Sequence, residues 1–79
     1  MYYVYAIKSL NRKYIYVGLT KDVSLRIQRH NKGYERTTKP YRPFVLFHLE
    51  RLPYRLSARK REKYLKSGVG KEFLKRLMK

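Results

Sequence analysis

The chain begins with two tyrosine-rich segments, Tyr3-Val4-Tyr5 and Tyr14-Ile15-Tyr16-Val17-Gly18. Aromatic and β-branched residues favour strands, and the polar turn at 9–13 predicts that strands at 2–7 and 14–19 form a hairpin. Tyrosines at alternate positions of two adjoining strands place their phenol groups on one face of a sheet. The hairpin therefore predicts a sheet face that carries phenols.

A short helix is predicted directly after the hairpin. Thr20-Lys21-Asp22 supplies an N-cap, and Asp22 also suits the positive end of a helix. Asn31-Lys32-Gly33 supplies the stop. Arg26 and His30 lie four residues apart and so share one face of this helix. If that face meets the sheet, phenols, a permanent cation and an imidazole converge, which indicates phosphodiester chemistry.

A third strand is predicted after a polar, basic loop at 33–43 that is bounded by prolines. The strand spans 44–50, where the alternation of side chains has period two. This alternation predicts that four side chains share one side of the strand: Phe44, Leu46, His48 and Glu50. His48 has no evident partner in the sequence, and we interpret it as structural.

Two helices complete the predicted fold. Pro53 ends the strand, and Ser57 caps or begins a helix that runs to Lys66, with four residues predicted to face inward: Leu56, Ala58, Glu62 and Leu65. The segment 67–70 breaks this helix, and a last helix spans 72–78. The order ββαβαα predicts an α/β (α+β) fold, a three-stranded antiparallel sheet flanked by helices, in a single domain at 1–79.

The composition restricts the function. The 79 residues hold 21 Lys and Arg but only five acids, which gives a net charge of +16. So positive a field favours a polyanionic partner, and nucleic acid is expected ahead of an anionic membrane surface. There is no cysteine, which excludes disulfides and thiolate metal sites. With neither a signal-peptide pattern nor an apolar run of bilayer length, we expect a cytoplasmic protein.

The spacing of five elements resembles the GIY-YIG nuclease superfamily. Tyr3-Val4-Tyr5 and Tyr16-Val17-Gly18 stand for its two motifs, with ten residues between them. Arg26 and His30 follow Tyr16 by ten and fourteen residues, at the positions of the family's helix, and Glu62 matches its metal-binding glutamate. The chain is similar to small stand-alone members and to the N-terminal nuclease domain of the UvrC repair protein.

The resemblance implies a metal-dependent endonuclease that hydrolyses DNA phosphodiester bonds. One divalent ion, Mg²⁺ or Mn²⁺, would be held by Glu62, while Arg26 would pair with the scissile phosphate. Tyr5 would act as general base or position water, and His30 would accept or relay its proton. Tyr16 would position the phosphate or a metal-bound water. We expect Arg26, the metal ion and the basic surroundings to lower the pKa of the Tyr5 phenol.

Each of these residues also has a structural interpretation. Tyr5 and Tyr16 suit the edge of a core, Arg26 suits a solvated face, and His30 suits the end of a helix. Glu62 is one of only five acids and could instead pair with Lys66 at i,i+4. Gly18 is expected to let the backbone approach the helix or the substrate without a Cβ in the way.

The basic loop predicts a nucleic-acid contact, because cations for phosphates alternate with aromatic rings that stack on bases. Its candidate residues are Lys32, Tyr34, Arg36, Lys39, Tyr41 and Arg42. An ordinary solvated loop is an equal alternative.

The resemblance favours double-stranded or branched DNA as the partner, with RNA possible, and low sequence specificity in repair or recombination. A catalytically inactive nucleic-acid-binding module and a small RNA-binding or nucleoid protein stay open as alternatives, and so does the oligomeric state.

Overall fold

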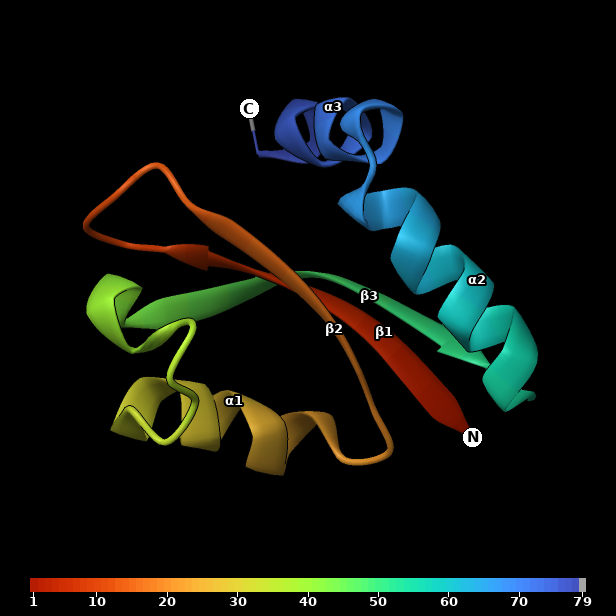
Figure 1. The fold of residues 1–79 in the computed structure, drawn as a ribbon, viewed down its shortest axis with the longest axis horizontal. Helices are drawn as coiled ribbons and strands as arrows, with labels where there is room; N and C mark the ends of the chain where they lie inside the picture. The colour runs from red at the N-terminus through yellow and green to blue at the C-terminus, as the bar shows by residue number, and fades with distance from the viewer. Residues whose placement is uncertain (79) are drawn as a thin grey trace.

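The computed structural model describes residues 1–78 and confirms the predicted order of elements (Figure 1). Its strands and helices are β1 (Tyr2–Ser9), β2 (Ile15–Thr20), α1 (Val23–Lys32), the short 3-10 helix η1 (Lys39–Tyr41), β3 (Phe44–Leu52), α2 (Arg55–Lys66) and α3 (Gly68–Leu77). The strands form one antiparallel sheet in the order β2-β1-β3, as the fold prediction requires. The central position of β1 explains why residues 4–7 are all fully buried.

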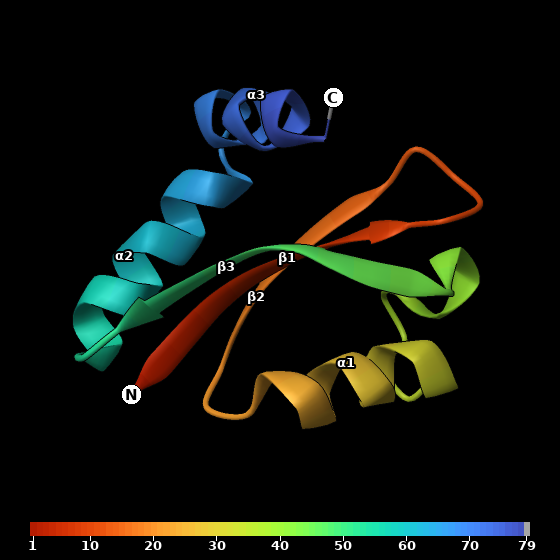
Figure 2. The same ribbon diagram turned by 180° about the vertical axis from the view of Figure 1, so that it is seen from behind.

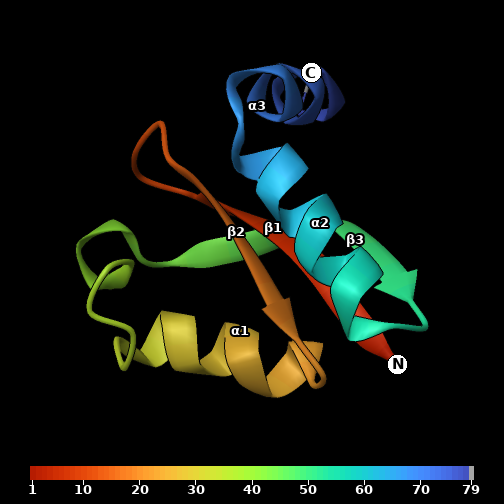
Figure 3. The same cartoon turned by 45° about the vertical axis from the view of Figure 1, so that its right-hand side comes forward.

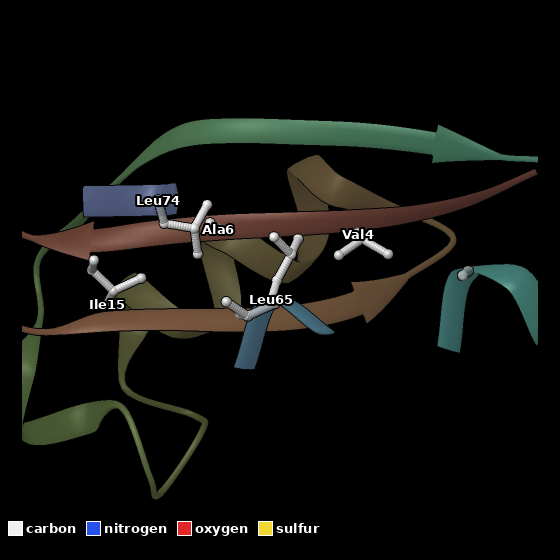
Figure 4. Close-up of a cluster of buried hydrophobic side chains, with 7 residues drawn as sticks. Val4, Ala6, Ile15, Leu65 and Leu74 are labelled. Carbon is white, nitrogen blue, oxygen red and sulfur yellow. The ribbon is translucent and has the colours of Figure 1, made fainter. Parts of the chain in front are cut away.

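Helices cover both faces of the sheet. Figures 1 and 2 show α1 on one side and α2 with α3 on the other. Alternation along β1 feeds a core on each side: Val4 and Ala6 pack with Leu65 and Leu74 of the helices α2 and α3, as Figure 4 shows. On the α1 side, the buried residues Tyr5, Ile7 and Phe44 form the second core. Tyr5 thus lies on the α1 side of the sheet, and Tyr14 and Tyr16 pack against the same core.

The ends of α1 follow the sequence prediction. The Asp22 carboxylate accepts a hydrogen bond from the Leu25 amide at 3.0 Å, which satisfies a free donor of the first turn. Gly33 ends the helix with φ of 82°, in the left-handed region where a side chain would be strained. The Asn31 side chain then bonds both backbone groups of Phe44 and so ties the end of α1 to the start of β3.

The predicted alternation of β3 is wrong in its second half. A bulge between the pairs of Ala6 and Ile7 shifts the register of β3 against β1. A bulge adds one residue and reverses which face the following side chains take. Phe44 and Leu46 therefore lie in the α1-side core, whereas His48 and Glu50 face α2 and α3. The expectation that His48 has no partner is also wrong, because its Nε2 lies 2.7 Å from Oε2 of Glu50.

The two C-terminal helices begin earlier than predicted. The helix α2 starts at Arg55, and Ser57 lies in its first turn, where its hydroxyl donates to the Tyr54 carbonyl. Ala58, Glu62 and Leu65 are buried as predicted. Leu56 is 69% exposed, so the prediction that it faces inward is wrong. Across residues 1–78, no helix is long and apolar enough to cross a membrane.

Gly68 and Gly70, which lie in the segment predicted to separate the two C-terminal helices, are part of α3. Ser67 caps this helix by accepting a hydrogen bond from the Gly70 amide. A Cβ at Gly70 would lie 2.1 Å from the Tyr64 carbonyl oxygen, so glycine allows the start of α3 to pack closely on the end of α2. The Ser67 cap and the close packing of Gly70 on the end of α2 therefore outweigh the low helix propensity of glycine at the start of α3.

Candidate active site

Tyr5 and Gly18 form the centre of the candidate site. They face each other across the antiparallel pair of β1 and β2. Tyr5 is fully buried, and a Cβ placed on Gly18 would lie 2.3 Å from the Tyr5 hydroxyl oxygen. Gly18 therefore makes room for the Tyr5 phenol of the neighbouring strand, whereas the expected close approach was to the helix or the substrate.

His30 brings the last turn of α1 onto this phenol. Its Nε2 lies 2.9 Å from the Tyr5 hydroxyl, and its Nδ1 lies 2.8 Å from Oγ1 of Thr38. Both His30 and Thr38 are buried. The Thr38 hydroxyl donates to the Glu35 carbonyl at 3.4 Å, so it is free to accept from Nδ1–H of His30. On this basis we assign the tautomer of His30 in which Nδ1 carries the proton and Nε2 accepts from the Tyr5 hydroxyl.

The protonation of this pair differs from the expectation. Burial raises the pKa of Tyr5, the nearby Tyr16 raises it further, and the opposing charge of Arg26 is a smaller effect. The expected lowering of the Tyr5 pKa is therefore wrong for the protein alone. Burial also lowers the pKa of His30, and it outweighs the charge of Glu35, which acts in the opposite direction. At neutral pH the buried pair consists of a neutral phenol and a neutral imidazole.

Tyr16 and Arg26 complete the α1 side of the site, and both are partly exposed. The Tyr16 ring centroid lies 5.0 Å from that of His30 and 6.4 Å from that of Tyr5. Arg26 acts on both members of the buried pair, since its charge lowers the pKa of Tyr5 and of His30. Within residues 1–78, Arg26 forms no ion pair, so its guanidinium can accept an anionic partner.

Glu62 approaches from the opposite side of the sheet, on α2. Figure 3 shows β2, an edge strand, between α1 and α2. The Glu62 side chain is only 9% exposed, and its two oxygens lie 3.3 Å from Arg59 and 3.3 Å from Lys66. The predicted i,i+4 pair with Lys66 is confirmed. No hydrogen bond or ion pair in the described part of the chain joins Glu62 to Tyr5, Tyr16 or His30.

Lys66 connects Glu62 to the other site residues through a contact with Tyr16 that the sequence did not reveal. Its Nζ lies 5.8 Å from the centre of the Tyr16 ring while it also pairs with the Glu62 carboxylate. Lys66 therefore reaches the β2 edge, where the two faces of the sheet meet. Because a lysine in a chain with 21 cations carries no signal of its own, only the fold could identify it.

The residues present fit a divalent ion only as a single-carboxylate site. In the described residues, no group of three or more His, Asp or Glu could hold a metal ion. Mg²⁺ keeps several of its waters and can be bound by one carboxylate together with a substrate phosphate. Glu62 meets this requirement if Arg59 and Lys66, whose side chains are 55% and 48% exposed, release its oxygens.

The predicted nucleic-acid loop divides into two sets. The Tyr41 ring stacks on Tyr14 at 3.9 Å between centroids, and the Arg42 guanidinium lies against Gly33. Tyr41 is thus held within the fold, whereas Arg42 contacts Gly33 but is itself exposed. The remaining candidates of the loop are exposed: Lys32, Tyr34, Arg36 and Lys39.

Comparisons with known proteins show the family of the chain. The family model of the GIY-YIG catalytic domain matches residues 1–76. The solution NMR structure of the UPF0213 protein BH0048 from Bacillus halodurans is 32% identical, has a TM-score of 0.58, and is matched over 98% of this chain and 85% of its own. A search of the curated proteins finds no match. GIY-YIG proteins are nucleases that act on DNA, generally with divalent metal ions. The chain belongs to the GIY-YIG family.

Proposed function

We propose that this protein is an endonuclease that hydrolyses DNA phosphodiester bonds with one divalent ion, Mg²⁺ or Mn²⁺. The observation that carries the proposal is the packing of Tyr5, Tyr16 and His30 against one another near Arg26, whose charge acts on both Tyr5 and His30. Ordinary phosphate binding does not need a buried phenol–imidazole pair. The substrate would be double-stranded or branched DNA in repair or recombination, bound with low sequence specificity because cations contact phosphates and not base edges.

Arg26 and Tyr16 are the side chains that a substrate would meet. Both are partly exposed, whereas Tyr5 and His30 are buried. The guanidinium of Arg26 is permanently charged, and its planar fork suits the charge that develops on the scissile phosphate. The Tyr16 hydroxyl would position the phosphate or the attacking water by a hydrogen bond.

His30 would be the proton acceptor, reached through Tyr5. The Tyr5 hydroxyl would take a proton from water as it gives its own proton to Nε2 of His30, so no free phenolate forms. The raised pKa of Tyr5 disfavours such a phenolate. Since Tyr5 is fully buried, water reaches its hydroxyl only when a neighbour moves. The partly exposed Tyr16 ring is the neighbour that a substrate would displace.

Glu62 would hold the divalent ion, which when bound supplies a Lewis acid that polarises the phosphoryl oxygen. In the free protein Arg59 and Lys66 occupy the carboxylate and balance its charge. Lys66 also lies over Tyr16, so its release from Glu62 would bring a second cation to the bound phosphate.

The occupied carboxylate favours a second candidate function, an inactive module that binds DNA without cutting it. If Arg59 and Lys66 hold Glu62 permanently, its oxygens are not available to an ion. The predicted fold and charge would then serve binding alone.

A cleavage assay separates the two functions. Supercoiled plasmid and branched duplexes are incubated with Mg²⁺ or Mn²⁺ and with the variants Glu62→Gln, Arg26→Gln and Tyr16→Phe. We expect each variant to lower the rate by about 10²-fold or more, the size of effect seen when one group that stabilises charge is removed. Glu72→Gln, an exposed glutamate on α3, is the matched control and should cut normally.

Thermal unfolding of each variant shows whether a loss of rate reflects a loss of fold. Folded wild-type protein that binds DNA but never cuts it supports the inactive module. Cleavage that survives Glu62→Gln and Arg26→Gln unchanged contradicts the proposed roles of both residues.

A further inference from the structure

A second basic site lies outside the candidate active site, at the end of the molecule where the β1–β2 turn approaches α3. Figures 1 and 3 show this turn and α3 on the same side of the sheet. Between them is an open hollow of about 770 Å³. Five cations line it: Lys8, Arg12 and Lys13 from the turn region, and Lys71 and Lys75 from α3. Within residues 1–78, no acidic side chain lines the hollow, although Lys75 forms an exposed ion pair with Glu72 at 3.9 Å.

The cations of this hollow are held close together by the fold. Lys71 reaches across from α3 and donates to the backbone carbonyl of Ile15 at 3.1 Å. Burial lowers the pKa of Lys71, and the positive charges of Lys75 and Lys66 lower it further. Neighbouring positive charges repel one another, and a bound anion would offset this repulsion.

The hollow and the candidate active site share the edge strand β2, although Ile15 faces the α2 and α3 side and Tyr16 faces the α1 side. Ile15 begins β2, and the next residue is Tyr16. Lys66 lies over the Tyr16 ring, and its charge acts on Lys71 in the wall of the hollow. Cations therefore follow the β2 edge from Tyr16 to the turn, with one end at the site where the phosphate would be cut.

We propose that this hollow binds the sugar-phosphate backbone of the DNA strand that passes Tyr16, several nucleotides from the scissile bond. The inference rests on the proposed function, because the strand's path starts at Tyr16. A concave wall of cations suits a curved phosphate backbone better than a flat lipid surface, which would require an exposed apolar face beside the charges. DNA long enough to fill both sites would bind more tightly than DNA that fills one.

Two exposed residues on opposite walls provide the test. The variant Lys13→Gln/Lys75→Gln removes one charge from the turn and one from α3. The control Lys60→Gln/Lys63→Gln removes the same charge from exposed positions on α2. Affinity is measured by fluorescence anisotropy, without divalent metal, on a duplex of about 20 base pairs. At 3.4 Å per base pair this is roughly twice the 32 Å long axis of the protein.

We expect the hollow variant to weaken binding about tenfold and to lower the salt slope by nearly two, one for each lost phosphate contact. The control should change both quantities less than half as much. Equal losses in the two variants would show that general charge, and not the hollow, is responsible, and would overturn the proposal.

Site-specific crosslinking maps the strand. Because the chain has no cysteine, Lys75→Cys gives a single thiol for a photoactivatable crosslinker, with Lys60→Cys as control. We expect crosslinks from position 75 to one side of the cleavage position and none from position 60.

If wild-type protein never cuts DNA but the hollow variant still weakens binding selectively, the proposed function fails while the proposed role of the hollow stands. If the hollow variant loses binding only to phosphatidylserine vesicles, the hollow is a lipid site and the proposal is wrong.

Discussion

Residue by residue, the site depends on a contact between two strands. Tyr5 can lie flat against β2 only because its cross-strand partner, Gly18, has no side chain. The hydroxyl of Tyr5 then meets His30, and the imidazole in turn meets Thr38. A side chain at position 18 would therefore displace Tyr5 and disturb its hydrogen bond to His30 and that of His30 to Thr38.

Gly18→Ala tests this dependence. The new Cβ would lie 2.3 Å from the Tyr5 hydroxyl oxygen, and the buried ring has no open space to move into. We expect the free energy of unfolding to fall by about 1–3 kcal/mol, as for other overpacked cores, and DNA cleavage to be lost. Urea denaturation measures the first effect and the plasmid assay the second.

Gly68→Ala is the matched control, because a Cβ there meets no atom within 4 Å and the residue lies in α3. Alanine has the higher helix propensity, so this variant should keep or slightly raise the stability. If Gly18→Ala is as stable and as active as Gly68→Ala, Gly18 does not position Tyr5.

The sequence predicted some of these residues and not others. The spacing of Tyr5, Tyr16, Arg26 and His30 predicted one cluster, and the fold brings them together. Thr38 could not be identified as the partner of His30, because the path of the loop at 33–43 decides which hydroxyl reaches the imidazole. The direction of the Tyr5 pKa shift was also wrong, since charge can be counted from a sequence whereas burial cannot.

Among the elements, β3 and α2 are joined by a polar cluster that the bulge makes possible. Arg61 of α2 donates two hydrogen bonds to Glu50, at 2.7 and 3.0 Å, and His48 lies 2.7 Å from the same carboxylate. Burial alone would raise the pKa of Glu50, but the hydrogen bonds from Arg61 and His48 outweigh it, and the pKa is lowered. Without the bulge, Glu50 would face the wrong side of the sheet.

The lowered pKa of Glu50 predicts a pH dependence of stability. A carboxyl group with a lower pKa in the folded state stabilises the fold above its unfolded pKa of about 4.3, and this contribution is lost as the pH falls through the folded pKa. Glu50→Gln should cost about 1–2 kcal/mol at roughly pH 7 and much less near pH 3. Urea denaturation of both proteins across this range measures the difference.

Glu72→Gln, which changes an exposed carboxylate, should show almost no difference at either pH. A cost for Glu50→Gln that is constant with pH would mean that the lost contribution is packing and not charge.

The elements themselves were predictable where local signals act alone. Strand-forming tyrosines, the Asp22 cap and the Gly33 stop lie within a few residues of the ends they determine. The bulge in β3 and the start of α3 depend on neighbours distant in sequence or on close packing, as at Gly70 against Tyr64. Patterns within a segment cannot contain that information.

Over the whole molecule, the candidate site is assembled around an edge and not on a face. Tyr5, Tyr16 and His30 lie on the α1 side, while Glu62 belongs to α2 on the other side. Spacing predicted the helices that carry these residues but could not give their sides of the sheet. At the β2 edge, where Lys66 lies beside Tyr16, a strand of DNA would contact the site residues on both sides of the sheet.

This arrangement predicts that binding and cutting can be separated by metal removal. Binding would depend on the net charge of +16, whereas cutting would also require an ion at Glu62. With a chelator present, we expect the protein to bind duplex DNA with an affinity that falls linearly in log–log form with salt, at a slope of about −0.9 for each phosphate contacted. Cleavage should stop completely and return when Mg²⁺ or Mn²⁺ is restored.

Anisotropy and plasmid cleavage, measured on the same samples, make the comparison. With chelator, Glu62→Gln should bind at least as tightly as wild type, because Arg59 and Lys66 no longer pair with a carboxylate, and it should not cut when the ion is restored. If the chelator abolishes binding as well as cutting, the ion and not the basic surface holds the DNA, and the division between an electrostatic surface and a single-carboxylate metal site is wrong.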